Sequence, residues 1–147
     1  MILALAASLL AVPRPSAATL RIFVANSGDN TVSVIDDDLD REIQTIPVGT
    51  FPQGLALRQR PSPLLAVANS RGNSVTLIDP VTLNKLGDDI PVGRFPVDMK
   101  FSADGQLLFC SSDDDQNIVV VDVQTRAPVG APISIGAPPR RLKLSGD

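Results

Sequence analysis

The stretch IFVANSGDNTVSVID, residues 22–36, decides the fold because the chain carries it three times. The second copy reads LAVANSRGNSVTLID at residues 65–79, and a weaker third copy reads LFCSSDDDQNIVVVD at residues 108–122. Each copy ends on an aspartate, and the period from one aspartate to the next is 43 residues. Self-similarity at a fixed period of this size indicates a repeat architecture.

A second motif follows each copy, ten residues after the first copy and eleven after the other two. It reads PVGTFPQGLAL at residues 47–57, PVGRFPVDMKF at 91–101 and SIGAPPRRLKL at 134–144. Together the two motifs predict one repeat domain over residues 19–147, with repeats near 20–63, 64–106 and 107–147.

Each repeat predicts four short strands and no helix, because its apolar residues lack helical spacing. In the first repeat the expected strands are 22–25, 31–35, 42–48 and 54–57. Pro47 cannot donate a backbone hydrogen bond, so the third of these strands is expected to be the outermost in its sheet. The fourth strand, compact and apolar, is expected to be the innermost.

Four antiparallel strands in about 43 residues predict an all-β chain of β-propeller blades, here three blades. The chain starts on the second strand of a blade and ends on an expected innermost strand, residues 140–144. Closed propellers have about four to eight blades, so three blades form an open arc. Two explanations stay open: the chain is part of a longer propeller, or a homodimer closes a six-bladed ring in which each 140–144 strand completes the partner's first blade.

The motifs VANSGDNTVSVID and VANSRGNSVTLID resemble the YVTN family of propeller repeats, and SADG at 102–105 resembles the family's turn between the two inner strands. The third copy departs from the family, with Ser112 in place of the motif's asparagine. The turn at 58–61 also departs from it. The resemblance implies a β-propeller whose ligands bind at one end of the central channel.

Residues 1–18 have the layout of a signal peptide: an apolar run, then prolines, then Ser16-Ala17-Ala18. The run is too short to span a membrane. The alternative is a buried N-terminal strand. We expect export, and hence a periplasmic or secreted bacterial protein without a membrane span.

Composition excludes several functions. The formal net charge is −3 with both signs scattered, which does not favour nucleic acid as a partner. The chain has no histidine, and therefore lacks the usual general base and zinc ligand. Its single cysteine, Cys110, falls within a strand and is expected to be buried and inert. We therefore expect no catalytic residues, cofactor or metal.

Acidic runs at 36–40, 88–89 and 113–115 lack the spacing of a known calcium loop. We interpret them as solvated turns. Asp36, Asp79 and Asp122 recur at one repeat position, which favours a structural role such as capping the following turn.

Candidate binding residues lie in the loops that enter the innermost strands and in those that join the second and third strands. Residues that differ between repeats are free to specialise. These residues are Gln53, Arg71, Arg94, Asp98 and Arg140. They predict a protein or a small polar ligand at this end of the channel.

Two functions follow. The first is an extracytoplasmic, non-catalytic binding or scaffold module. The alternative, which rests on fold analogy alone, is an enzyme or accessory subunit that resembles lactonase-like or quinoprotein-associated propellers, whose acidic residues can hold a metal. Of these two functions, we favour the non-catalytic one.

Overall fold

The computed structural model describes residues 20–145. These residues form strands and turns only, so this part of the chain holds no helix that could cross a membrane. The predicted signal peptide, residues 1–18, lies outside the described residues.

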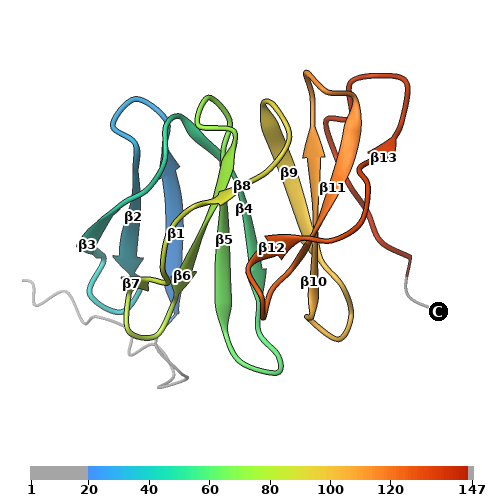
Figure 1. Cartoon of the computed structure of the whole chain (residues 1–147). Coiled ribbons are helices and arrows are strands. Elements are labelled where there is room, and N and C mark those ends of the chain that lie inside the picture. The colour runs from blue at the N-terminus through green and yellow to red at the C-terminus, as the bar shows by residue number, and fades with distance from the viewer. Residues whose placement is uncertain (1–19, 146–147) are drawn as a thin grey trace, which may run out of the picture.

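Three antiparallel sheets follow one another along the chain (Figure 1). The first contains β1 (Arg21–Asn26), β2 (Thr31–Asp36) and β3 (Arg41–Pro47). The second contains β4 (Pro52–Arg58), β5 (Leu64–Asn69), β6 (Ser74–Asp79), β7 (Asn84–Lys85) and β8 (Ile90–Pro91). The third contains β9 (Pro96–Phe101), β10 (Leu107–Ser112), β11 (Asn117–Asp122), β12 (Ala127–Pro128) and β13 (Ile133–Ser134).

Strand order matches the predicted blade. In the second and third sheets, β4 and β9 form the innermost edge, and each pairs with the strand that follows it. Pro47 ends β3, which pairs only with β2 and is the outermost strand of its sheet, as predicted. The outermost position of the other two blades is broken into two short strands, β7 with β8 and β12 with β13.

Apolar side chains pack between neighbouring sheets and form two cores. Val32 and Val34 of the first sheet pack against Leu65 and Val67 of the second. The second sheet packs its opposite face, including Ala66, against the third. Both faces of β5 are therefore buried along its whole length, as the apolar character of the predicted strands implied.

A buried asparagine ties the two central strands of the second blade together. Asn69 is fully buried, and its Nδ2 donates hydrogen bonds to Ser74 Oγ at 3.1 Å and to Thr76 Oγ1 at 2.9 Å. Asn26 makes the same pair of bonds in the first blade. In the third blade Ser112 takes this position, and its buried hydroxyl has no partner among the described residues.

The recurring aspartates cap turns, as predicted. Asp36 Oδ1 accepts hydrogen bonds from the backbone N–H groups of residues 38 and 39, both at 3.0 Å. Asp79 accepts from residues 81 and 82 in the same way, and Asp122 from residue 125. These backbone hydrogen bonds hold the pKa values of Asp79 and Asp122 below the usual range.

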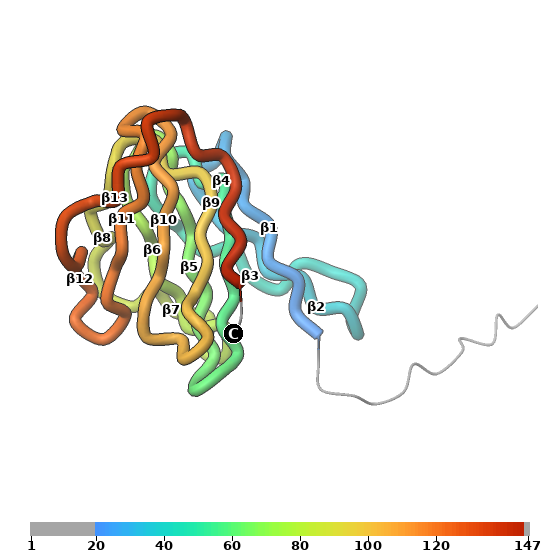
Figure 2. The backbone as a smooth tube through the Cα atoms, turned by 90° about the vertical axis from the view of Figure 1, so that its right-hand side faces the viewer, coloured from blue at the N-terminus to red at the C-terminus, as the bar shows by residue number. Residues whose placement is uncertain are grey.

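The expected innermost strand at 140–144 is not a strand in the structure. This segment is extended and runs beside β9 (Figure 2), where the Leu142 N–H donates to Asp98 Oδ2 at 2.8 Å. It occupies the innermost position of a next blade, but the described residues offer no following strand to pair with it. Within residues 20–145 the first blade conversely has no innermost strand, because β1 pairs only with β2 there.

Replacement of Asn69 by alanine is expected to lower the free energy of unfolding by about 2–3 kcal/mol, because two buried hydrogen bonds are lost and two hydroxyls are left without their donor. Urea denaturation measures the change. The exposed Asn84→Ala is the control and is expected to stay within about 0.5 kcal/mol of the parent. Equal effects of the two substitutions would contradict this role for Asn69.

Candidate functional site

The loops that carry the predicted binding residues meet at the upper end of the molecule in Figure 1. Each loop entering an innermost strand is bonded to the loop between the second and third strands of the same blade. Thus Gly72 N–H donates to the Thr50 carbonyl at 3.1 Å, and Asp113 N–H donates to the Phe95 carbonyl at 3.0 Å. The predicted loops therefore share one end of the arc.

Two of the predicted residues are held against their own loops. The Arg71 guanidinium lies over the Phe51 ring, 4.2 Å from its centroid. Gln53 Oε1 accepts a hydrogen bond from Ser70 Oγ at 3.0 Å. The first contact joins two loops and the second joins β4 to the turn after β5, so both side chains stabilise the loop geometry.

Arg94 is fixed by an acidic loop. Its backbone N–H donates to Asp115 Oδ2 at 2.7 Å, and its Nε donates to Asp115 Oδ1 at 2.6 Å. The paired charge raises the pKa of Arg94 and lowers that of Asp115. The acidic run at 113–115 thus neutralises a residue that we predicted to bind a ligand.

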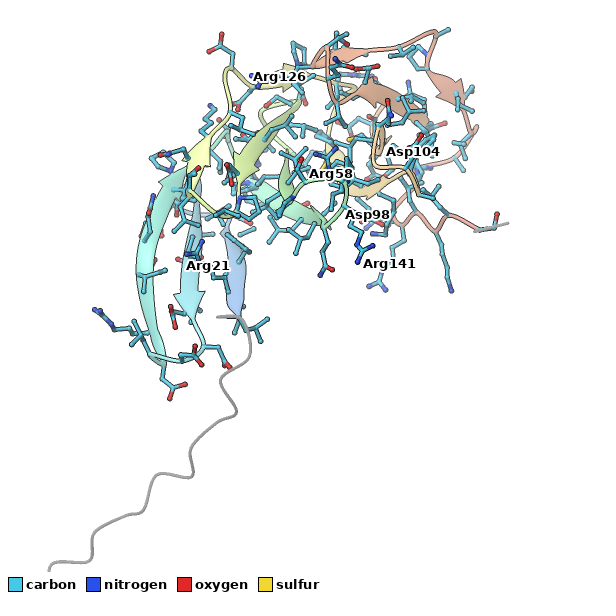
Figure 3. The ribbon with its side chains drawn as sticks, turned by 90° about the horizontal axis from the view of Figure 1, so that it is seen from below. Arg21, Arg58, Asp98, Asp104, Arg126 and Arg141 are labelled. Carbon is cyan, nitrogen blue, oxygen red and sulfur yellow. The ribbon has the colours of Figure 1, made fainter. Side chains whose placement is uncertain are left out.

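Asp98 and Arg140, the remaining two predicted residues, lie together. They line a pocket of about 440 Å³ on the inner side of the arc, with Lys100 and Arg141 among its other lining residues. Figure 3 shows Asp98 and Arg141 on this concave side. The Arg140 side chain is 81% exposed and approaches Asp113 only to 3.9 Å.

Asp98 is the anchor of this pocket. Burial disfavours its charged form, but hydrogen bonds from Leu142 N–H, Lys100 Nζ and Met99 N–H outweigh burial, so the pKa of Asp98 lies below its usual range. The carboxylate is therefore ionised at neutral pH and already has its donors. Lys100 and Arg141 supply positive charge, together with Arg140, for an anionic group.

Sequence reasoning missed Lys100 and Arg141. In the repeat alignment Arg141 takes the position of Gly54 and Asp98, on consecutive innermost strands. A comparison of this one position across the blades would have placed Arg141 and Asp98 on adjacent innermost strands.

The described residues offer neither a cluster of metal ligands nor a reactive thiol. Residues 20–145 hold no group of three histidine, cysteine, aspartate or glutamate side chains arranged for a metal ion. Cys110 is fully buried, as predicted, and burial raises its thiol pKa to about 12. A thiol with that pKa is not a nucleophile near neutral pH.

No protein-family model matches the chain. The uncharacterized protein YwhL of Bacillus subtilis is 42% identical over 55 residues, which is 37% of this chain and 12% of that protein. Hydrazine synthase of Kuenenia stuttgartiensis is similar in structure, with a TM-score of 0.74 and 22% identity over 82% of this chain and 34% of that chain. The dihydro-heme d1 dehydrogenase NirN gives a TM-score of 0.66 and 22% identity over 84% of this chain and 26% of its own.

U3-55K is also similar, with a TM-score of 0.67 and 16% identity over 78% of this chain and 36% of that chain. These solved structures are β-propellers, and the three unclosed sheets fit part of such a propeller. At these identities the similarity shows the fold alone. The chain spans about a third of the hydrazine synthase chain and about an eighth of YwhL, and it has the fold of a partial β-propeller.

Replacement of Asp98 by alanine is expected to speed hydrogen exchange of the Leu142 amide about tenfold, because that amide loses its acceptor. In the parent protein the protection should persist at neutral pH and disappear as the pH falls through the lowered pKa of Asp98, since only the carboxylate accepts this bond well. Mass spectrometry of exchanged peptides measures both effects. Lys100→Gln leaves the hydrogen bond from Leu142 to Asp98 in place and is the control. An equal increase in the exchange rate of the Leu142 amide in that variant would show that Asp98 does not hold this segment.

Proposed function

We propose that the chain is a YVTN-type propeller segment that acts outside the cytoplasm as a non-catalytic binding scaffold, and that a second copy completes it. The resemblance of the repeats to the YVTN family supports membership of that family. The signal-peptide layout of residues 1–18 supports export. The open edge of the first blade carries the scaffold proposal.

The open edge exposes apolar residues at positions that the other blades bury. Ile22 and Val24 of β1 are 44% and 39% exposed. The same repeat positions in β5 are Leu65 and Val67, which are 2% and 0% exposed. Among the residues that the structure describes, the first blade thus has neither a second neighbouring blade nor an innermost strand.

The opposite end of the arc offers the missing strand. Residues 139–144 align with β4 and β9, and the register of β4 with β5 would place Leu142 opposite Val24 and Leu144 opposite Ile22. This end also has an open face. Ile118 and Val120 are only half-buried there, whereas the equivalent Val75 and Leu77 of the second blade are buried.

Two copies related by a two-fold axis would pair the open β1 edge and cover the open face of the third blade in both copies. Each copy would donate its 139–144 segment to the β1 edge of the other, and each open face would gain a neighbour. The resulting ring would have six blades, a number within the usual range for closed propellers.

The loop end of this ring is where we expect a ligand or protein partner to bind. The side chain of Arg140 is more exposed than that of Arg94, the other predicted arginine in an ion pair. Arg140 lines the same pocket as Lys100 and Arg141. These charges favour an anionic group. Arg140 and Arg141 belong to the 139–144 segment and Lys100 lines the same pocket, so ligand binding and ring closure would involve the same stretch of chain.

Light scattering on the purified chain tests the assembly. We expect twice the 15.5 kDa mass of one chain, and a Val24→Lys variant should be monomeric because a charge cannot be buried at the closed edge. Leu39→Lys changes another exposed apolar residue of the same blade, away from β1, and should remain dimeric. A well-folded parent that stays monomeric at tens of micromolar would contradict the dimer.

Cross-linking tests the register. A chain carrying Val24→Cys and Leu142→Cys should give a covalent dimer with a short bismaleimide, whereas Val81→Cys with Leu142→Cys should not. The native Cys110 does not interfere, because it is buried and its pKa is raised to about 12. Links formed only within single chains would exclude the exchanged strand.

A further inference from the structure

The lower end of the molecule, opposite the predicted loops, contains a pocket between the second and third blades. Its volume is about 410 Å³, and it has an apolar floor that includes Leu64 and Leu77. Two arginines line it, Arg58 at the end of β4 and Arg126 in the turn before β12. Both are labelled in Figure 3, which views the molecule from this end.

Both arginines differ from the residues at the same positions of the other repeats, which for Arg126 are Asp40 in the first and Leu83 in the second. The position of Arg126 is occupied in the second blade by Leu83, which is 7% exposed and fills the apolar core between the first two blades. The two turns are otherwise the same: each residue has positive φ, and each backbone N–H bonds the carbonyl of the capping aspartate. An arginine therefore stands where the preceding interface has a packed leucine.

Arg58 belongs to the turn that differs from SADG in sequence. It lies at the repeat position of Ser102, which bonds its own turn. Arg58 instead crosses to the third blade, where it donates to the Gly105 carbonyl at 2.5 Å, and it also donates to the Ser62 carbonyl at 3.0 Å. Partial burial lowers its pKa.

Neither guanidinium has a carboxylate partner among the described residues. Arg58 and Arg126 donate to backbone carbonyls and, for Arg58, to a serine hydroxyl. No acidic residue lines the pocket. The adjacent carboxylates are engaged elsewhere, Asp104 with Ser102 Oγ and Gln106 N–H, and Asp122 with Thr125 N–H.

Glycines make room for both arginines. A Cβ on Gly87 would come within 2.5 Å of Arg126 Nη1, and a Cβ on Gly105 would come within 2.5 Å of Arg58 Cδ. The backbone therefore lies directly against each guanidinium arm, which limits the positions the two charges can take.

We propose that this pocket binds a small organic anion, a carboxylate with an apolar body. The two uncompensated arginines would hold the carboxylate, aided by polar side chains such as Gln106 and Gln124, and the leucine floor would cover the apolar part. The site is built entirely within one chain, from the second and third blades. It therefore does not depend on the scaffold function or on the dimer.

Calorimetric titration of the purified chain with 2-naphthoate tests the proposal, with the neutral 2-naphthalenemethanol as the uncharged counterpart. We expect 2-naphthoate to bind at one site per chain and more tightly than the alcohol by about tenfold or more, since the charged hydrogen bonds are lost in the alcohol. Binding should weaken as salt is added. Equal affinity for acid and alcohol, or no heat with 2-naphthoate at millimolar concentration, would overturn the proposal.

Arg126→Leu is the decisive variant, because leucine is the residue that the same turn carries in the second blade. It should fold with a melting temperature at or above that of the parent and lose at least about tenfold in 2-naphthoate affinity. Arg41→Leu removes the same charge from an exposed position on β3 and should bind as the parent does. Unchanged affinity in Arg126→Leu would exclude this pocket. If that variant fails to fold, Arg126→Gln, which removes the charge and keeps a polar side chain, replaces it with the same expected loss, and unchanged affinity in it would exclude the pocket.

Discussion

Each sheet of this protein depends on apolar contact with another sheet on both of its faces. A blade is a single sheet of short strands, and its β-branched and aliphatic side chains alternate above and below it with no polar face to offer water. Only the second blade meets the requirement fully: β5 is buried along its whole length because the first and third blades cover its two faces. In the described part of the chain the two outer blades each have one apolar face without a neighbouring sheet, and the proposed assembly follows from that difference.

The two ends of the arc differ in what their polar side chains do. At the upper end, neighbouring loops are tied to one another by backbone bonds, by the ring contact of Arg71 and by the ion pair of Arg94. Most of the polar residues there maintain the spacing of the blades. At the lower end the capped turns share their geometry, and the difference lies in single side chains: Arg58 and Arg126 stand at the repeat positions of Ser102 and Leu83.

Much of the blade could be predicted from the sequence, because the determinants are local. Pro47 at a strand edge, the capping aspartates and the burial of Cys110 follow from properties of single residues and their repeat positions. The broken outermost strands of the second and third blades could not be predicted. An outermost strand pairs on one side only, so its length depends on which of its few hydrogen bonds the tertiary context preserves.

The candidate site was predicted less well, since it depends on partners far apart in the chain. Asp98 and Arg140 do lie together, but Arg94 is paired with Asp115 and Arg71 lies on Phe51. Each of these contacts joins the loop that enters an innermost strand to the loop between the second and third strands, and the repeat pattern alone does not say which exposed charge finds a partner.

The sequence by itself determined the period, the strand order within a blade and the all-β class, because repeated apolar strands and turn residues act over a few neighbouring positions. Only the tertiary structure decided that residues 140–144 lie beside β9 without a strand partner, that the β1 edge is open, and that two arginines share a pocket between blades. The physical reason is that an unpaired edge or an uncompensated charge is defined by what does not lie next to it, and that is known only when all the blades are packed.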